Sequence, residues 1–187
     1  MIEIRWHGRG GQGVVTAAKV LAAAALDQGK HIQAFPEFGP ERRGAPIQAF
    51  TRIDNNPIKL FSHVTSPHII VVLDRTLVGK IPFTEGLVKD GTVIVNCRHS
   101  AQHLRDEIGL SYGKVFAVDA TTIANETIGR PITNTPMLGA LIKATEILNI
   151  DAVKQELRAF FGAKLSPKAV QANIDALQRA YEEVHGE

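Results

Sequence analysis

Cysteine is almost absent from this sequence of 187 residues, and its scarcity excludes several kinds of site. Cys97 is the only cysteine, so the chain cannot form an internal disulfide. An iron–sulfur cluster is usually held by about four cysteine thiolates, which one chain of this sequence cannot supply. The sequence therefore excludes a cysteine-ligated redox centre within the chain.

An excess of one charge and a long apolar run are also lacking. Lysine plus arginine number 21 and aspartate plus glutamate number 19, a formal net charge of +2, which does not indicate a nucleic-acid-binding protein. The apolar run from Ile69 to Leu73 is far too short to span a bilayer. Glu3 and Arg5 interrupt the start, where a signal peptide has an apolar segment. We expect a cytoplasmic protein that binds neither nucleic acid nor membrane.

The remaining composition is that of an ordinary globular domain. Hydrophobic residues make up 44% and charged residues 21% of the chain, and the length allows one sizeable core. We find no internal repeat, low-complexity tract or linker that would divide it. We therefore expect a single domain over residues 1–187.

The N-terminal residues combine a short strand, a glycine-rich turn and the start of a helix. Apolar and polar residues alternate from Ile2 to Trp6, as in a strand, and a helix is predicted from about residue 12 to residue 28. Between them lies a turn with the Gly-x-Gly-x-x-Gly spacing, formed by Gly8, Arg9, Gly10, Gly11, Gln12 and Gly13. Such a turn can cradle an anion at the helix N-terminus. The alternative is a tight turn that binds no ligand.

The rest of the chain alternates between strand and helix patterns. A second strand over residues 31–35 is expected to lie beside the first after a right-handed crossover. Residues 47–53 are expected to form an antiparallel hairpin with residues 58–61. In a helix expected from Asn134 to about Leu148, Gly139 lowers helix stability and therefore indicates close packing. Further buried strands are predicted over residues 69–73, 92–96 and 115–118.

These elements predict an α/β fold. We expect a doubly wound, mainly parallel sheet with a Rossmann-like start and a small antiparallel hairpin annex.

Arginines follow several of the predicted strands. Arg42 and Arg43 lie in a loop rich in glycine and proline, and Arg9, Arg75 and Arg98 each follow another strand. The carboxyl ends of parallel strands meet at one edge of a sheet, where ligands of open α/β sheets bind. A cluster of arginines there suits a polyanion such as a nucleotide, coenzyme A or an acidic protein surface. The alternative is that they are ordinary surface arginines.

No other pattern identifies a catalytic group or a metal site. His99 and His103 have the spacing of a metal-binding pair on a helix, but no further cluster of ligands accompanies them. We interpret them as exposed histidines at a helix start. We therefore predict no catalytic residue and no metal ligand in this chain.

Three segments of the chain carry a resemblance to a known family. They are His7–Thr16 (HGRGGQGVVT), Phe35–Pro46 (FPEFGPERRGAP) and Asn134–Ala140 (NTPMLGA). Together they resemble the gamma subunits of 2-oxoacid:ferredoxin oxidoreductases, and the pyruvate synthase type is the most similar. The resemblance implies an enzyme complex that converts pyruvate, coenzyme A and oxidised ferredoxin reversibly into acetyl-CoA, carbon dioxide and reduced ferredoxin.

The resemblance also implies where the cofactors lie. Thiamine diphosphate is expected on the alpha and beta subunits and the [4Fe–4S] clusters largely on a ferredoxin-like delta subunit, with none bound by this chain. The chain is then a non-redox subunit, inactive alone, that helps to frame the assembly and the coenzyme A route. The turn from Gly8 to Gly13, with Arg42 and Arg43, is the expected contact with coenzyme A, another anion or a neighbouring subunit. The partner subunits select the 2-oxoacid, pyruvate or 2-oxoisovalerate.

Two other interpretations stay open. One is a free-standing oxidoreductase that binds NAD(P) or another nucleotide at the glycine turn, with Glu37 near the place of a ribose-binding acid. It predicts tight binding of NAD(P) by the isolated chain. The other is a binding module that docks on a partner through the turn and the loop of Arg42 and Arg43, without a small ligand.

Overall fold

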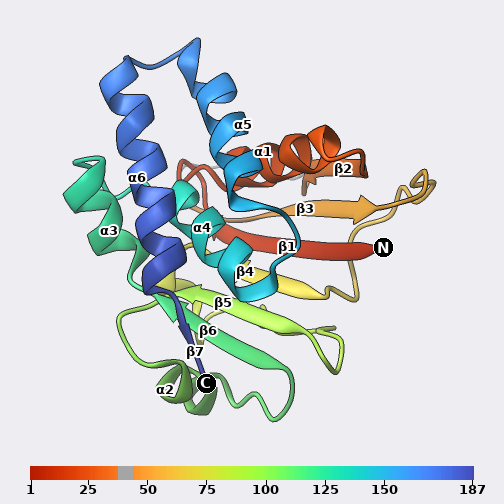
Figure 1. Cartoon of the computed structure of the whole chain (residues 1–187). Coiled ribbons are helices and arrows are strands. Elements are labelled where there is room, and N and C mark those ends of the chain that lie inside the picture. The colour runs from red at the N-terminus through yellow and green to blue at the C-terminus, as the bar shows by residue number, and fades with distance from the viewer. Residues whose placement is uncertain (38–43) are drawn as a thin grey trace.

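The computed structural model describes residues 1–37 and 44–187 and contains one seven-stranded sheet (Figure 1). Its strands are β1 (Ile2–Arg9), β2 (His31–Pro36), β3 (Pro46–Asp54), β4 (Ile69–Val72), β5 (Thr92–Asn96), β6 (Lys114–Val118) and β7 (His185–Gly186). Their order across the sheet is β2-β3-β1-β4-β5-β6-β7. Strands β1, β4, β5 and β6 run parallel, whereas β3 and β7 run antiparallel to their neighbours. The predicted α/β class with a mainly parallel sheet is confirmed.

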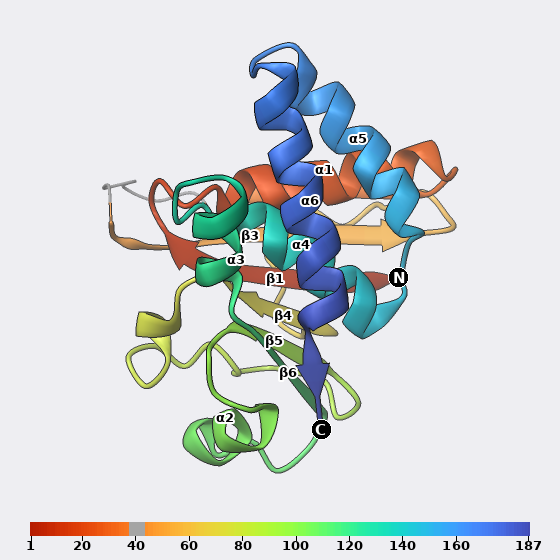
Figure 2. The same cartoon turned by 60° about the vertical axis from the view of Figure 1, so that its left-hand side comes forward.

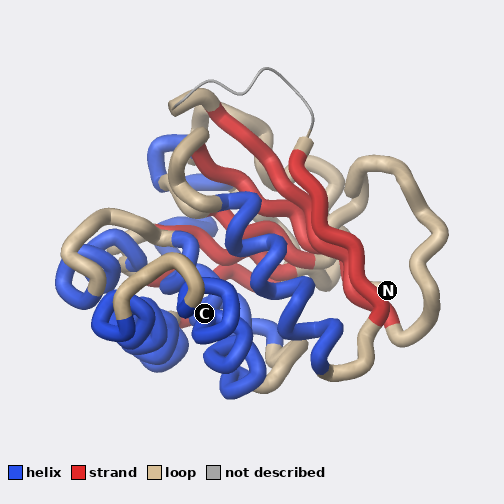
Figure 3. The backbone as a smooth tube through the Cα atoms, turned by 90° about the horizontal axis from the view of Figure 1, so that it is seen from above, coloured by secondary structure: helices blue, strands red, loops and turns tan. Residues whose placement is uncertain are grey.

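Helices cover the two faces of the sheet unequally (Figures 2 and 3). They are α1 (Val14–Asp27), α2 (Ala101–Ile108), α3 (Ala120–Thr127), α4 (Asn134–Thr145), α5 (Ile150–Gly162) and α6 (Pro167–Glu183), with the short 3-10 helix η1 (Arg75–Leu77). Most of them bury the larger apolar cluster on one face, whereas α2 and the segment that begins with η1 cover the other. Within the described ranges, none of the helices combines the length and the apolar character needed to cross a membrane.

The position of β3 differs from the prediction in two ways. β3 lies between β1 and β2, so the first two strands are not neighbours, and residues 58–61 form no strand. The antiparallel part of the sheet is formed by β3 with β2 and β1 instead. The physical reason for this arrangement is the length of the strand pairing. β3 pairs with eight residues of β1 and six of β2, whereas a return strand over residues 58–61 would satisfy far fewer main-chain groups.

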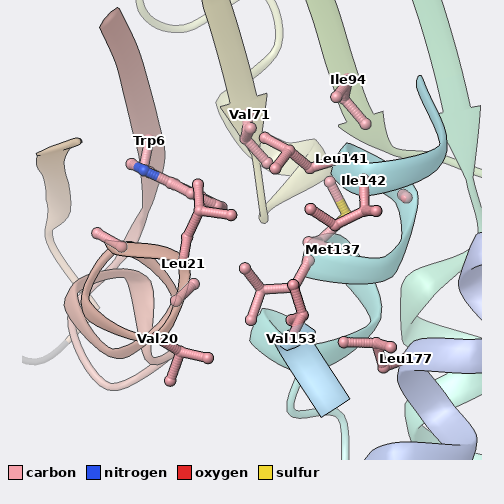
Figure 4. Packing of buried hydrophobic residues seen from close by; sticks show 14 of the residues in the cluster. Trp6, Val20, Leu21, Val71, Ile94, Met137, Leu141, Ile142, Val153 and Leu177 are labelled. Atoms are coloured by element: carbon pink, nitrogen blue, oxygen red, sulfur yellow. The ribbon is translucent and has the colours of Figure 1, made fainter. Parts of the chain in front are cut away.

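The larger core lies between the sheet and the helices α1, α4 and α6 (Figure 4). Trp6 of β1, Leu21 of α1 and Met137 of α4 are fully buried there. The indole N–H of Trp6 donates a hydrogen bond to the hydroxyl of Thr51 at 3.0 Å. Trp6 therefore buries a large apolar surface without leaving its one donor unpaired.

Helices α4 and α6 approach each other closely at Gly139. A Cβ atom at this position would overlap the carbonyl oxygen of Leu177 in α6. The close packing that the sequence predicts from a glycine inside a helix is confirmed.

Candidate functional site

The glycine-rich turn lies where the chain leaves β1, at the carboxyl edge of the sheet. After β1 the chain passes into α1 on one face, whereas after the neighbouring strand β4 it passes into η1 on the opposite face. Neighbouring parallel strands whose connections leave to opposite faces open a crevice at their carboxyl ends, the usual ligand position in open α/β sheets. The turn from Gly8 to Gly13 lies at this topological position.

Backbone shape and close packing both account for glycine in this turn. Gly11 and Gly13 have φ angles of +94° and +77°, a region that favours glycine. A Cβ atom on Gly13 would lie 2.5 Å from the Nδ2 atom of Asn134, and one on Gly8 would lie 2.5 Å from the Cγ2 atom of Val14. The turn therefore requires these glycines with or without a ligand.

The start of α1 is free of acidic side chains. Its cap residue is Gly13, which offers no side-chain hydrogen bond, and the first turn of the helix contains no Asp or Glu. The first N–H groups of a helix have no partner within the helix and carry the positive end of its dipole. This end of α1 fits an anionic group.

Gln12 connects the turn to the end of β4. Its Oε1 atom accepts a hydrogen bond from the backbone N–H of Arg9 at 2.8 Å, and its Nε2 atom donates to Oδ2 of Asp74 at 2.6 Å. The side chain of Gln12 thus occupies one main-chain donor of the turn. It also links the end of β1 to the end of β4.

Arg9, which the sequence predicts as an anion contact, already has an acidic partner. Its Nε atom lies 3.2 Å from Oδ2 of Asp74, and its guanidinium also donates to the hydroxyl of Thr76. Burial by itself raises the pKa of Asp74, but hydrogen bonds from Thr76 and Gln12 and the charge of Arg9 lower it below its ordinary value. Asp74 is therefore a negative charge beside the turn, and it opposes the binding of an anion unless further cations are present.

Main-chain hydrogen bonds join the turn to the segment that follows the arginine loop. The N–H of Gly10 donates to the carbonyl of Ala45 at 2.9 Å, and the N–H of Gly44 donates to the carbonyl of Gly10 at 3.2 Å. Arg42 and Arg43 themselves lie outside the described residues. The residue directly after Arg43 is therefore bonded to the turn.

The first segment of the family resemblance contacts both of the other two at this edge. The first segment bonds the second at Gly10 and packs against the third where Gly13 meets Asn134. Thr133, which precedes the third segment, directs its hydroxyl to the carbonyl of Leu73 at 3.3 Å. The motifs are therefore parts of one structural unit.

The other predicted arginines lie farther along the same edge. Arg75 and Arg98 line a pocket of about 260 Å³ between the carboxyl ends of β5 and β6, together with Asn96, Cys97, His99, Asp119 and Thr121. Arg75 pairs with Glu107, and Nε of Arg98 lies 2.9 Å from a carboxylate oxygen of Asp119. The structure thus brings Arg75 and Arg98 together but does not place Arg9 in their pocket.

A buried pair of polar residues on β1 was missed by the sequence prediction. His7 and Arg5 are only 2% and 8% exposed, and Nε of Arg5 donates to Nε2 of His7 at 3.1 Å. Burial, and to a lesser extent the charge of Arg5, lower the pKa of His7 to about 3. The ring is therefore neutral at ordinary pH, with its proton on Nδ1, and Nδ1 has no hydrogen-bond partner among the described residues. The available signal was the alternation of Arg5 and His7 with Ile4 and Trp6 in one strand.

His99, which lines the pocket of Arg75 and Arg98, lies beside His103. Their ring centroids are 4.6 Å apart. In the part of the chain that the structure describes, no group of three or more His, Cys, Asp or Glu residues is arranged to hold a metal ion.

Comparison with known proteins gives consistent matches over nearly the whole chain. Residues 3–183 match the pyruvate ferredoxin/flavodoxin oxidoreductase family. The chain is 49% identical to the pyruvate/ketoisovalerate oxidoreductases common subunit gamma of Pyrococcus abyssi, over 96% of this chain and 97% of that protein. It is 47% identical to pyruvate synthase subunit PorC of Thermotoga maritima, over 97% and 94% of the two chains. The crystal structure of the pyruvate oxidoreductase subunit PORC from Thermotoga maritima superposes with a TM-score of 0.87 at 43% identity, covering 100% of this chain and 98% of that one.

Proposed function

Because the chain belongs to the pyruvate ferredoxin/flavodoxin oxidoreductase family, we propose that it is the gamma subunit of a multi-subunit 2-oxoacid:ferredoxin oxidoreductase, with pyruvate as the 2-oxoacid. The observation that carries this proposal is the match to gamma and PorC subunits over almost their full length. In this assembly the alpha, beta and delta subunits are the partners and ferredoxin is the electron acceptor. The reaction is the reversible, coenzyme A-dependent oxidative decarboxylation of pyruvate to acetyl-CoA and carbon dioxide.

The cofactors of the proposed reaction belong to the partner subunits. Thiamine diphosphate supplies the carbanion-stabilising chemistry and [4Fe–4S] clusters accept the electrons. The single cysteine of this chain does not fit a cluster, for which about four thiolates are usual. The chain therefore acts by binding and positioning, and we expect no activity from it alone.

We assign the anion contact to the turn from Gly8 to Gly13 together with Arg42 and Arg43. Two observations support this assignment: α1 begins without an acidic residue, and Gly44 bonds directly to Gly10. Because Arg9 is paired with Asp74, we assign the additional positive charge to Arg42 and Arg43. The contacted group is the polyanionic part of coenzyme A or an acidic surface of a neighbouring subunit.

Reconstitution tests the proposed function. Purified alpha, beta and delta subunits are assayed for pyruvate-dependent reduction of ferredoxin with and without this chain. We expect activity only when this chain is added and a complex that contains all the subunits. Oxidation of pyruvate by this chain alone, or its failure to join the other subunits, would contradict the proposal.

Variants of the arginine loop test the proposed contact. Replacing Arg42 and Arg43 by Ala removes two charge-assisted contacts, each worth about 1.5–3 kcal/mol if desolvated and less if exposed. We expect a raised apparent KM for coenzyme A in the assembled enzyme, with decarboxylation of the 2-oxoacid little changed. If the double variant does not assemble, the loop contacts a subunit instead. Normal assembly together with normal coenzyme A kinetics would refute both roles.

The dinucleotide alternative meets a specific obstacle at the glycine turn. The carboxylate of Asp74 lies beside the turn, and Gln12 occupies the backbone N–H of Arg9. Both features disfavour a pyrophosphate in the position that it takes in dinucleotide-binding folds. Tight binding of NAD(P) by the isolated chain, measured by calorimetry, would reverse this conclusion.

A further inference from the structure

Strand β2 forms one edge of the sheet (Figure 1). It pairs with β3 on one side, and no strand among the described residues pairs with it on the other. An edge strand presents unpaired N–H and C=O groups that can pair with another chain. The identity of these groups follows from the register of β2 and β3.

The outward residues of β2 are Ile32, Ala34 and Pro36, of which only Ile32 and Ala34 have an N–H group. The N–H of Glu37 donates to the carbonyl of Gln48 at 3.0 Å, so this pair is a hydrogen-bonded one. Hydrogen-bonded and non-bonded pairs alternate along an antiparallel ladder, so Phe35 and Gln33 also bond to β3. Ile32 and Ala34 therefore direct their N–H and C=O groups away from β3, and none of these groups has a partner in the described structure.

An apolar groove runs along the same edge. It has a volume of about 440 Å³ and is lined by Ile32, Gln33, Ala34 and Phe35 of β2 and by Leu60 and Phe61 of the following loop. Gln33 holds this loop in place, because its Nε2 atom donates to the carbonyl of Leu60 at 2.8 Å. Leu60 is 45% and Phe61 is 92% exposed. Exposed apolar side chains that line a groove indicate an interaction site.

We propose that this groove receives an extended segment of a partner subunit, which adds to the sheet as a strand beside β2. Ile32 and Ala34 are two residues apart, and both have free N–H and C=O groups. A strand pairs with its neighbour through every second residue, so this spacing suits an added strand. The groove wall of Leu60 and Phe61 fits apolar side chains on one side of the segment. The exposed Lys59 directly precedes Leu60 of this wall and fits an acidic residue in the segment.

This inference rests on the proposed function, since the partner is one of the other subunits of the complex. It adds which surface of this chain the partner uses and in which conformation. The occupant must be extended. It must have N–H groups where it bonds to Ile32 and Ala34, which excludes proline at those positions.

Hydrogen exchange of individual amides tests the pairing without any substitution. In the isolated chain, the amides of Ile32 and Ala34 should exchange faster than those of Gln33 and Phe35, which are bonded to β3. In the assembled enzyme, the amides of Ile32 and Ala34 should become as protected as their neighbours. Unchanged exchange at both residues in the complex would overturn the proposal. Protection in the isolated chain that increases with concentration and accompanies dimer formation would identify a second copy as the occupant, and would equally overturn it.

Two substitutions with matched controls test the groove. Ala34→Pro removes an outward N–H that has no partner in the isolated chain, and proline is tolerated on edge strands. Ala34→Ser keeps the N–H and serves as its control. Phe61→Ser removes the most exposed part of the apolar wall, and Leu165→Ser, at the 40% exposed Leu165 of the turn between α5 and α6, is its control. Unchanged melting temperatures establish that the variants fold.

We expect Ala34→Pro and Phe61→Ser each to weaken association with the other subunits about tenfold or more, since each removes a hydrogen bond or an apolar contact of the interface. The two controls should bind like the original chain. If the original chain does not associate at all, the proposed function fails. If the original chain and Ala34→Pro associate equally well, the function stands and the docking groove is wrong.

Discussion

The two faces of β1 are both buried but are stabilised in different ways. On one face Ile4 and Trp6 are fully buried in the larger apolar cluster. On the other face Arg5 and His7 are almost as inaccessible, and Arg5 donates to the main-chain carbonyls of Phe83 and Glu85. Burial alone therefore does not identify the core, because one face depends on apolar area and the other on directional hydrogen bonds.

The polar face continues onto β3 through Arg52. This residue is 1% exposed, and its guanidinium donates to Glu3 at 2.8 Å, to Gln33 at 3.1 Å and to the carbonyl of Ser62 at 2.7 Å. Arg52 therefore links β1, β2 and the loop after β3. A buried charge is tolerated only when its donors are paired in this manner.

Truncating the apolar face should have the largest effect on stability. Trp6→Ala removes a fully buried indole and should lower the free energy of unfolding by about 3–5 kcal/mol, because a cavity remains. Denaturant titration measures this loss. Phe61→Ala, at a residue that is 92% exposed, is the control and should change the stability of the isolated chain by less than about 0.5 kcal/mol. A loss below about 1 kcal/mol for Trp6→Ala would show that the core relaxes around the gap.

Breaking the charge pair on the polar face should have the next largest effect. Arg52→Met leaves the carboxylate of Glu3 unpaired and should lower the free energy of unfolding by about 3 kcal/mol. The double variant with Glu3→Gln should lose less than the sum of the two single losses, since the uncompensated charge is then absent. Arg98→Met, whose side chain is 72% exposed, is the matched control with an expected change of at most about 0.5 kcal/mol. Strictly additive losses would contradict a coupled pair.

The polar face should also make stability depend on pH. Unfolded His7 gains a proton below its ordinary pKa of 6.5, whereas folded His7 does so only near its lowered pKa of about 3. The unfolded state therefore binds more protons between these values, and stability falls as the pH decreases from 6.5, by up to about 1.4 kcal/mol per pH unit. His7→Gln should flatten this part of the profile, as measured by denaturant titrations from pH 7 to pH 4. Parallel profiles for the two proteins would rule out His7 as the source.

Adding a methyl group where α4 packs against α6 should have the smallest effect on stability. Ala is favoured over Gly in helices by about 1 kcal/mol, but a Cβ atom at Gly139 would overlap the carbonyl of Leu177. Gly139→Ala should therefore destabilise the chain by about 1–3 kcal/mol despite its helix propensity. Gly162→Ala is the control in α5, because no atom lies within 4 Å of the added Cβ, and it should not destabilise. A stabilised Gly139→Ala variant would show that α4 and α6 can move apart.

Much of the fold could be predicted because the relevant signals are local. The alternation from Ile2 to Trp6 and the apolar run from Ile69 to Leu73 indicated strands, and the structure has strands at Ile2–Arg9 and Ile69–Val72. Ser100 and Ser166 accept hydrogen bonds from the third residue after each of them, as N-caps do. Such features depend on neighbours a few residues away, so they can be read along the chain.

The candidate site was predictable in its parts but not in its assembly. The glycine turn and the arginines after the strands were recognised from residue type and spacing. The pairing of Arg9 with Asp74 and the hydrogen bond from Gln12 to Asp74 could not be predicted, because Asp74 is distant from both residues in the sequence. The free edge at Ile32 and Ala34 could not be predicted from the sequence either, since it depends on which strand lies beside β2.

The sequence by itself determined the α/β class, the strand–turn–helix start and the family, because hydrophobic period, glycine spacing and motif residues are properties of short segments. Only the tertiary structure decided that β3 lies between β1 and β2, that Asp74 neutralises Arg9, and that one face of β1 is apolar while the other is charged and buried. The physical reason is that strand order and charge pairing are set by contacts between distant segments. These contacts form where the largest number of main-chain and side-chain groups can be satisfied together.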